Sequence, residues 1–351
     1  MPSKNPRVLV VGSGAIGGTI TAHLLDAGVD VVPVVTNPRT KQALLQSGFR
    51  LQGHTALKHV DCPLLIDSVQ QAEGEFEAVL LAVQPPQVEE AAAAAASRLS
   101  QDGALVCFQN GLCEERVERF VGRHRVIGGV VAWGASMPEP GLFDKTSSGG
   151  FTLGQIDGER SQRLEQVAEL LTAVGPVDIT SNLLGARWSK LGLNCAVSTL
   201  GTLGGQHLGG ILVRTFVRRL GIEIVTETVR TAEASGVTLE RVATAADIRR
   251  FALGTSSGRS SRAGLLLRHA MLLAVGARYR RLRSSMLQAI ERGRPPAVDF
   301  LNGEVVSRAK RYGVEVPVNR RAQELVWEIA RGERKPGLHT LRALYEETRS
   351  A

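Results

Sequence analysis

The sequence predicts two unlike parts, an N-terminal α/β domain with a doubly wound parallel sheet and an all-α C-terminal domain. A glycine-rich turn lies between a short apolar run and a helical stretch at the very start of the chain. Short apolar runs then alternate with helical stretches through the first half, which is the pattern of βαβ units. Beyond residue 181 the strand signal fades and long helical periodicities replace it. We therefore expect domains at 1–181 and 182–351.

The apolar runs of the first half predict a parallel sheet that is covered on both faces. Strands are expected at 7–11, 31–35, 78–83, 104–108, 126–132, 151–154 and 177–179, and the clearest helix at 89–99. In the second half, apolar residues recur with helical spacing. Helices are expected there at 186–200, 211–235, 262–291, 298–312 and 318–331, and a mobile loop at Thr255–Ser261.

The turn that follows the first predicted strand has a dinucleotide-binding spacing. Gly12, Gly14 and Gly17 form a G-x-G-x-x-G pattern between an apolar run and a helical stretch. The first glycine permits the tight turn, the second lets the backbone approach a pyrophosphate, and the third allows close packing of helix on strand. Free N–H groups at the helix N-terminus favour phosphates. We therefore predict a Rossmann domain whose cofactor-binding turn is Gly12-Ser13-Gly14-Ala15-Ile16-Gly17.

The residues after the second predicted strand indicate which dinucleotide binds. The fingerprint usually continues with an acidic residue about twenty positions on, which holds the ribose hydroxyls. Here Asn37, Arg39 and Lys41 follow the strand, and no carboxylate ends it. A carboxylate would repel a 2′-phosphate, so its absence beside two cations favours NADP over NAD. The alternative is that Arg39 and Lys41 only begin a solvated helix.

Composition and charge limit the classes of function. The chain of 351 residues suits two domains, and no run of apolar residues is long enough for a membrane span or a signal peptide. Cys62, Cys107, Cys113 and Cys195 have no metal-ligand spacing, so we expect a cytoplasmic protein without a metal. The net charge of +8 comes largely from late arginines at helical spacing without interleaved aromatics. This indicates solvated helix faces and an anionic cofactor and substrate, not a nucleic-acid partner.

A polar stripe opens the predicted second domain. Lys190, Asn194 and Ser198 recur at i, i+4 and i+8, which places them on one face of a helix. In isolation the pattern is typical of a surface stripe with a snorkelling lysine. Beside a nicotinamide, however, carbonyl reduction requires a group that protonates the developing alkoxide and stabilises its charge. Lys190 is therefore a candidate general acid.

A second candidate site follows the strand expected at 104–108. Asn110 lies in Phe108-Gln109-Asn110-Gly111, directly after that apolar run. Ligands of open parallel sheets lie beyond the carboxyl ends of the strands. Asn110 is therefore placed to reach cofactor or substrate, although Asn-Gly is also an ordinary turn signal.

In its order of motifs the chain resembles the ketopantoate reductase (2-dehydropantoate 2-reductase) family almost from end to end. After the glycine fingerprint come Leu80-Leu81-Ala82-Val83, Gln109-Asn110-Gly111, Lys190-x-x-x-Asn194, Ser284-Ser285-Met286-Leu287-Gln288, Asp299-Phe300-Leu301-Asn302-Gly303 and Gly313-Val314-Glu315-Val316-Pro317-Val318-Asn319. The resemblance implies an NADPH-dependent reductase of a 2-oxo acid, with its active site between a Rossmann domain and a helical domain.

The resemblance also implies roles for individual residues. Lys190 matches the general acid, and Asn110 matches an asparagine near the nicotinamide ribose and the substrate. Asn194 matches a substrate-binding asparagine, and Ser284 or Ser285 matches a serine that meets the substrate carboxylate. These residues are therefore expected to surround the reacting carbonyl group.

Several positions depart from the family pattern. Gln84 replaces a lysine after the third strand, and Ser198 replaces a second asparagine one turn beyond Asn194. Ala297 replaces a glutamate, and Ala289 replaces an aspartate. Because a site that hydrogen-bonds its substrate rejects analogues strongly, loss of such groups predicts a changed substrate. Gln84 should still lie at the cofactor site and Ser198 at the substrate site, and a weaker NADP preference is expected.

Two further readings of the sequence stay open. Hydroxyisobutyrate-type dehydrogenases also place a lysine and an asparagine on a helix after a Rossmann domain, and opine-type enzymes reduce imines. A non-enzymatic NADP(H) sensor would use the same cleft to control a partner, although binding alone does not require the combination of Lys190, Asn194 and Asn110. The expected partner is a small-molecule 2-oxo acid, and the apolar stripes of the helical domain are compatible with a homodimer.

Overall fold

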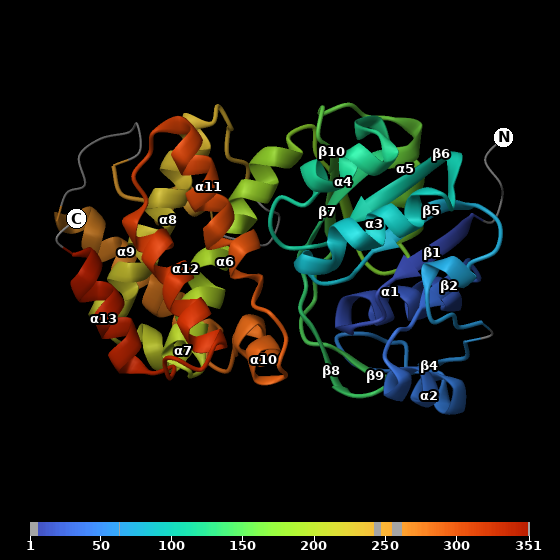
Figure 1. Ribbon diagram of the computed structural model, residues 1–351, viewed down its shortest axis with the longest axis horizontal. Coiled ribbons are helices and arrows are strands. Elements are labelled where there is room, and N and C mark those ends of the chain that lie inside the picture. Colours follow the sequence, from blue (N-terminus) through green and yellow to red (C-terminus); the bar gives the residue numbers. More distant parts are fainter. Residues whose placement is uncertain (1–5, 63, 242–246, 255–261, 350–351) are drawn as a thin grey trace. The chain divides into compact units, whose positions relative to one another are not determined.

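The computed structural model describes residues 6–62, 64–241, 247–254 and 262–349. The chain divides into two compact units, each described here by itself (Figure 1). The sheet unit comprises Met1–Gln109 and Cys113–Leu183, and the helical unit comprises Asn110–Leu112 and Leu184–Ala351. The loop predicted at Thr255–Ser261 lies outside the described residues.

The sheet unit is built on a seven-stranded sheet in the order β11-β10-β7-β6-β5-β1-β2 (Figure 1). All neighbouring strands are parallel except β10 and β7, so the sheet is mostly parallel as predicted, and it departs from the prediction at this one antiparallel pair. Two parallel neighbours need a crossover connection between them. The segment between β7 and β10 instead forms a hairpin that belongs to a second sheet, and β10 then runs antiparallel to β7. The strands are β1 (Arg7–Val11), β2 (Asp30–Val34), β5 (Phe76–Leu81), β6 (Leu99–Cys107), β7 (Val126–Val131), β10 (Phe151–Gln155) and β11 (Val177–Ile179).

Helices cover both faces of this sheet because its strands are apolar at consecutive positions. Val10 and Leu80 join one core with Ile20 of α1 (Ala15–Asp26) and Leu164 of α5 (Gln162–Leu171). On the other face, α3 (Val88–Ala96) contacts β5 and β6, and α4 (Glu114–Val121) contacts β7. The helix predicted at 89–99 is therefore too long, since β6 already begins at Leu99.

A second, four-stranded sheet was missed by sequence reasoning. Its order is β4-β3-β9-β8, and it packs beside α1 and α2 (Pro38–Ser47). Phe143 stacks on Phe49 at 5.6 Å and lies so close to Gly18 of α1 that a Cβ there would meet its ring at 2.0 Å. Charged and exposed residues interrupt these strands, which removes the apolar signal. They are β3 (Phe49–Gly53), β4 (His59–Val60), β8 (Ala135–Glu139) and β9 (Leu142–Lys145).

The helical unit has a large apolar core, to which residues from Trp188 to Leu344 contribute. Two of the predicted helices, 211–235 and 262–291, are each divided into two shorter helices. Arg218 donates to the carbonyl of Leu212 (2.7 Å), the last residue of α7, and Ser284 caps α10 by accepting from Leu287 N (3.3 Å). The helices are α6 (Leu183–Gly204), α7 (Leu208–Leu212), α8 (Thr215–Ala234), α9 (Arg262–Arg278), α10 (Ser285–Glu291), α11 (Asn302–Tyr312), α12 (Pro317–Ala330) and α13 (Leu338–Thr348). Short 3₁₀ turns in the chain are η1 (Val69–Gln71), η2 (Pro85–Gln87), η3 (Arg123–Arg125), η4 (Ile248–Arg250) and η5 (Ala297–Phe300).

A buried polar network ties α6, α8, α11 and α12 together. Glu227 of α8 accepts from the backbone N–H of Val318 (2.9 Å) and of Asn319 (2.8 Å), so it caps the N-terminus of α12. Asn302 donates to the side chain of Asn319 (2.9 Å), and Thr199 of α6 donates to Asn302 (2.6 Å). Each of these buried polar groups gains a partner, which offsets the cost of desolvation.

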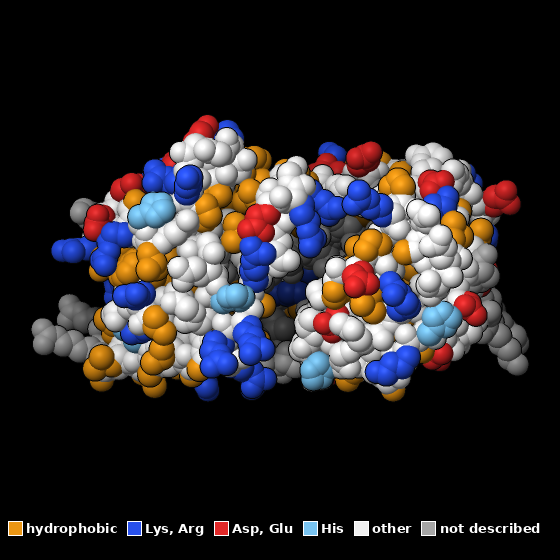
Figure 2. Space-filling view, turned by 90° about the horizontal axis from the view of Figure 1, so that it is seen from below, with side chains coloured by type: hydrophobic (Ala, Val, Ile, Leu, Met, Phe, Trp, Pro, Cys, Tyr) orange, Lys and Arg blue, Asp and Glu red, His pale blue; other side chains and the backbone are white. Residues whose placement is uncertain are grey.

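Basic side chains are distributed over both units. Figure 2 shows Lys and Arg on each unit in the face it draws, with Asp and Glu among them. Several arginines form local ion pairs, such as Arg321 with Glu324 (2.8 Å) and Glu328 (2.9 Å). Among the described residues, no group of three or more His, Cys, Asp or Glu could hold a metal, and no helix has the length and apolar character that crossing a bilayer requires. The four cysteines are free thiols.

Candidate functional site

The glycine turn after β1 has the backbone geometry of a dinucleotide cradle. Gly12 has a φ of +105°, and a Cβ there would lie 2.9 Å from the backbone of Ala82. A Cβ on Gly17 would lie 1.9 Å from the carbonyl oxygen of Gly12, so helix and turn touch without side chains between them. Gly14 has no neighbour within 4 Å of its ideal Cβ position. The turn is therefore closed at Gly12 and Gly17 and open at Gly14, where a phosphate would approach.

The N-terminus of α1 faces this opening. Gly14 is the N-cap residue, no side chain caps the helix, and no acidic residue lies in the first turn. Gly14 is exposed, whereas Ala15 and Ile16 are half-buried. The buried hydroxyl of Ser13 donates to Val34 O (3.1 Å) and joins the ends of β1 and β2. Uncapped N–H groups and the positive end of the helix dipole fit a phosphate group, so the residues present fit a dinucleotide.

The loops after β5 and β6 lie at the same edge as the glycine turn, because β5 is parallel to β1 and β6 is parallel to β5. Gln109 extends from the end of β6 and donates to Leu81 O (2.8 Å) and Val83 O (3.2 Å). This buried side chain fixes the start of the loop after β5, a role that sequence reasoning did not assign. Gln84 in that loop is exposed. Gln84 is thus available to a ligand at the edge that carries the glycine turn.

The structure reveals a carboxylate near the end of β2 that sequence reasoning missed. Ile66 forms a parallel bridge with Val34, which brings Asp67 to the carboxyl end of β2. Lys41 binds Asp67 at 2.8 Å, and this hydrogen bond lowers the pKa of the Asp67 carboxyl. The pairing commits Lys41 to a protein partner. Sequence reasoning looked for an acidic residue directly after the second strand. It missed Asp67 because this residue comes from a separate segment of the chain.

Asn37 and Arg39 occupy the turn after β2. The side-chain oxygen of Asn37 accepts a hydrogen bond from Thr40 N (3.1 Å) and caps α2. This oxygen therefore has a structural role. Arg39 is exposed and has no ion-pair partner among the residues that the structure describes. Arg39 is therefore the available cation of this turn.

The polar stripe of α6 exists as a helix face. Lys190, Asn194 and Ser198 are all half-buried, while the intervening Leu191 and Cys195 are buried in the core of the helical unit. The Nδ2 atom of Asn194 is buried and has no hydrogen-bond partner among the described residues. A buried amide donor left without an acceptor costs free energy unless a ligand completes it. This orphaned donor marks the stripe as a candidate site.

The two candidate serines at the start of α10 differ in their surroundings. Ser284 is buried, and its hydroxyl contacts Ser198 O (2.8 Å) and the hydroxyl of Thr202 (2.8 Å) besides capping α10. The hydroxyl therefore anchors α10 to α6. Ser285 is exposed. Of the pair, Ser285 is the one whose side chain the fold leaves accessible.

Asn110 belongs to the helical unit although it follows a strand of the sheet unit. The segment Asn110–Leu112 groups with the helical unit, and Leu112 is part of its core. Gly111 has a φ of +99°, and a Cβ there would lie 2.5 Å from Phe300 O. The exposed Asn110 is thus held on the same unit as Lys190 and Asn194.

Comparison with known proteins identifies the family. The model of the ketopantoate reductase PanE/ApbA family matches residues 8–158, and the model of its C-terminal domain matches residues 182–330. The chain belongs to the ketopantoate reductase PanE/ApbA family. The family resemblance and the fold class predicted from the sequence are therefore confirmed.

Individual relatives match this chain over nearly its whole length. A 2-dehydropantoate 2-reductase of Pyrococcus horikoshii is 24% identical and covers 94% of this chain and 98% of its own length. A PanE/ApbA family ketopantoate reductase from Ralstonia eutropha JMP134 has a TM-score of 0.78 at 23% identity, covering 93% of this chain and 99% of that one. D-mandelate dehydrogenase with NADH and anilino(oxo)acetate has a TM-score of 0.76 at 18% identity, with coverages of 93% and 99%. At these identities the two structures show a shared fold.

Proposed function

We propose that this oxidoreductase reduces a 2-oxo acid to the 2-hydroxy acid with NADPH, and that Lys190 is the general acid. The observation that carries the proposal is the polar face of α6, where the orphaned amide donor of Asn194 lies one turn from Lys190. A polar pair of this kind suits a carbonyl group that acquires negative charge. The family membership of the chain supports a reductase reaction over simple nucleotide sensing.

In this proposal the chain binds the cofactor phosphates at Gly14 and the N-terminus of α1. The bound reduced nicotinamide supplies hydride to the carbonyl carbon. Lys190 donates a proton from Nζ to the carbonyl oxygen, and its charge stabilises the oxyanion before that transfer. Asn194 donates a hydrogen bond that orients the substrate. Asn110, Ser198 and Ser285 complete the substrate-binding set, while Ser284 acts through the position of α10.

Arg39 is expected to set the cofactor preference. We expect tighter binding of NADPH than of NADH, because Arg39 offers the 2′-phosphate a charge partner whereas Lys41 is held by Asp67. Arg39→Ala should reduce the NADPH/NADH affinity ratio, and Asp67→Asn should raise it by releasing Lys41. Fluorescence titration of both reduced cofactors measures these ratios. Gln84 should make the wild-type preference weaker than a lysine would.

The Lys41→Ala variant is the matched control. Because Lys41 is paired with Asp67, its substitution alone should change the NADPH/NADH affinity ratio little. Tighter binding of NADH by the wild-type protein would refute the NADPH assignment. An Arg39→Ala protein with an unchanged NADPH/NADH affinity ratio would show that another residue binds the 2′-phosphate.

The substrate is expected to differ from ketopantoate. Ala297 and Ser198 stand where the family resemblance places polar substrate-holding groups. We expect poor turnover of ketopantoate and better turnover of a 2-oxo acid with a larger or more apolar side chain. The measurement is kcat/KM for NADPH oxidation with a panel of 2-oxo acids. Efficient and selective turnover of ketopantoate would contradict this expectation.

The same panel, repeated with added amines, tests the other candidate functions. Turnover that depends on an amine would indicate an imine reductase of the opine type. No turnover with any member, despite tight NADPH binding, would favour a sensor. Amine-independent turnover of a 2-oxo acid is the result that the proposed function requires.

A further inference from the structure

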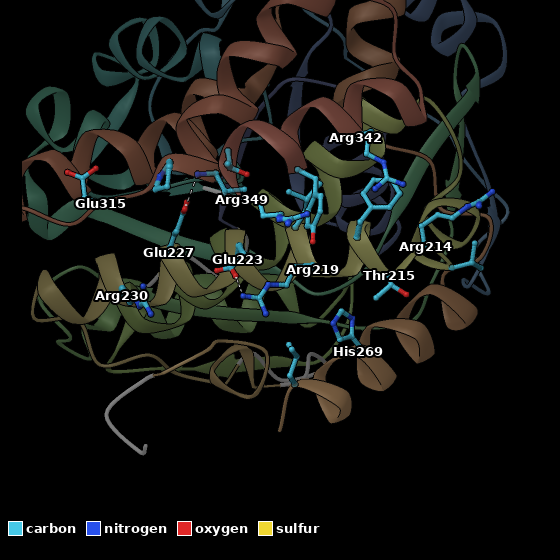
Figure 3. A pocket seen from close by; sticks show the side chains of 18 residues that line it. Arg214, Thr215, Arg219, Glu223, Glu227, Arg230, His269, Glu315, Arg342 and Arg349 are labelled. Carbon is cyan, nitrogen blue, oxygen red and sulfur yellow. Dashed lines mark hydrogen bonds and ion pairs between the residues drawn. The ribbon is translucent and has the colours of Figure 1, made fainter. Parts of the chain in front are cut away.

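The helical unit contains a large cavity that the proposed function does not use. It lies among α8, α9, α13 and the N-terminal end of α12, has a volume of about 1130 Å³, and is drawn in Figure 3. We call it the α8–α13 cavity. The lining residues used in the argument below are Arg214, Thr215, Phe216, Arg219, His269 and Arg342. None of the candidate reductase residues lines it.

Positive charge dominates the lining of the α8–α13 cavity. Five arginines contribute to it, namely Arg214, Arg219, Arg230, Arg342 and Arg349. Of these, only Arg219 forms an ion pair within the described part of the chain, and its partner is Glu223 of the cavity wall. The other four guanidinium groups have no carboxylate partner among the described residues. Such a concentration of like charge in a concave surface favours an anion.

The remaining carboxylates of the cavity, Glu227 and Glu315, form no ion pair with the described arginines that line it. Glu227 caps α12 through the N–H groups of Val318 and Asn319, and burial raises its pKa to about 7. Glu315 lies 3.9 Å from Arg320. These carboxylates therefore do not neutralise the unpaired arginines. Figure 3 shows Glu227, Glu315 and Arg230 toward one end of the cavity, and Arg214 and Arg342 toward the other.

The arginine-rich end also contains a helix N-terminus. Arg214 is the N-cap of α8, no side chain caps this helix, and its first turn contains no acidic residue. The α12 N-terminus in the same cavity is capped by Glu227, so the two helix ends differ. A 20-residue helix with uncapped N–H groups beside free guanidinium groups provides both donors and charge for a phosphate.

Aromatic and neutral groups adjoin the cationic end. Arg342 lies over the ring of Phe216 with its guanidinium carbon 4.1 Å from the centroid, and Phe216 contacts Tyr345 at 5.9 Å. The Nδ1 atom of His269 is buried without a hydrogen-bond partner among the described residues. Burial and the neighbouring Arg218 and Arg219 lower the pKa of His269. The cavity thus offers an apolar wall and a hydrogen-bonding imidazole beside its charges.

We propose that the α8–α13 cavity binds a small organic polyphosphate, with its phosphates at the α8 N-terminus, Arg214 and Arg342 and its organic part against Phe216 and Tyr345. The volume exceeds what one phosphate fills, and the unpaired Arg214 and Arg342 beside the uncapped α8 N-terminus favour a ligand with more than one negative charge. A second copy of the chain fits less well, because a two-fold interface would bring the same arginines together.

Isothermal titration of the full chain with inorganic tripolyphosphate tests the site. The double variant Arg214→Gln/Arg342→Gln should weaken binding at least about tenfold. The control Arg292→Gln/Arg311→Gln removes the same charge from exposed positions outside the cavity and should leave the affinity unchanged within about twofold. Binding at the glycine turn is the same in both double variants, so it does not mimic this difference. If Arg342→Gln disturbs folding through Phe216, Arg214→Gln alone should still weaken binding.

Adenosine triphosphate tests the organic part of the ligand. It should bind the cavity more tightly than tripolyphosphate does, and Tyr345→Ala should remove that advantage. Equal loss of tripolyphosphate affinity in both arginine variants, or no loss in either, would overturn the proposal. So would a concentration-dependent dimer, seen by light scattering, that the cavity variant dissociates. These outcomes are independent of turnover, so they do not depend on the reductase assignment.

Discussion

Lys190→Ala is expected to lower kcat by about 10²–10⁴-fold, because loss of a general acid removes the proton donor for the alkoxide. NADPH affinity should stay nearly intact, since the proposed site for the cofactor phosphates is the glycine turn of the sheet unit. Steady-state kinetics combined with direct cofactor titration separates these two effects. Lys190→Arg is an informative companion, because arginine keeps the positive charge but does not release a proton. It should recover little of the lost rate.

Asn194→Ala is the matched control on the same helix face. In the proposed mechanism its amide orients the substrate and transfers no proton, so KM should rise more than kcat falls. Since Asn194 lies one turn from Lys190, the two substitutions should couple in a double-mutant cycle by about 0.5–3 kcal/mol. A folded Lys190→Ala protein that binds NADPH and turns over at the wild-type rate would remove the centre of the proposed mechanism.

The glycine turn is expected to give the second large effect, through two substitutions of opposite kind. Gly17→Ala should destabilise the sheet unit by about 3 kcal/mol, because its Cβ would lie 1.9 Å from Gly12 O. Gly14→Ala should change the free energy of unfolding by less than about 1 kcal/mol, since open space surrounds that position. It should instead weaken NADPH binding by about tenfold or more, because the methyl group occupies the phosphate approach.

Denaturant unfolding and cofactor titration of both variants distinguish these expectations. Gly28→Ala is not a suitable control, because its φ of +77° adds strain of its own. Ala15→Gly provides a better one, since it alters the first turn of α1 without adding a side chain to the phosphate approach. A Gly14→Ala protein that is stable and binds NADPH as tightly as the wild type would show that the phosphates lie elsewhere.

The sequence alone determined the fold class and the backbone chemistry of the cofactor turn. Strand β1, the three glycines and α1 are consecutive in the chain, and their spacing specifies the local geometry. The polar face of α6 was likewise readable, because helical periodicity places Lys190, Asn194 and Ser198 together. Both signals act over a few residues, so local rules suffice to interpret them.

Tertiary structure decided what depends on contacts between distant segments. Asp67 reaches the end of β2 through the bridge between Ile66 and Val34, and there it binds Lys41, one of the two cations whose presence after β2 favoured NADP in the sequence. Ser284 could be read only as a candidate ligand until its contacts with α6 showed that its hydroxyl anchors α10.

The α8–α13 cavity had no sequence signal, because its arginines come from separate helices that lie more than 100 residues apart. Arg214 and Arg342 lie at the start of α8 and within α13, and they line one cavity only when these helices pack. Helical periodicity describes which residues share a face, but not which face meets another. That choice depends on burial of apolar surface over the whole unit, and it determines which charges become neighbours.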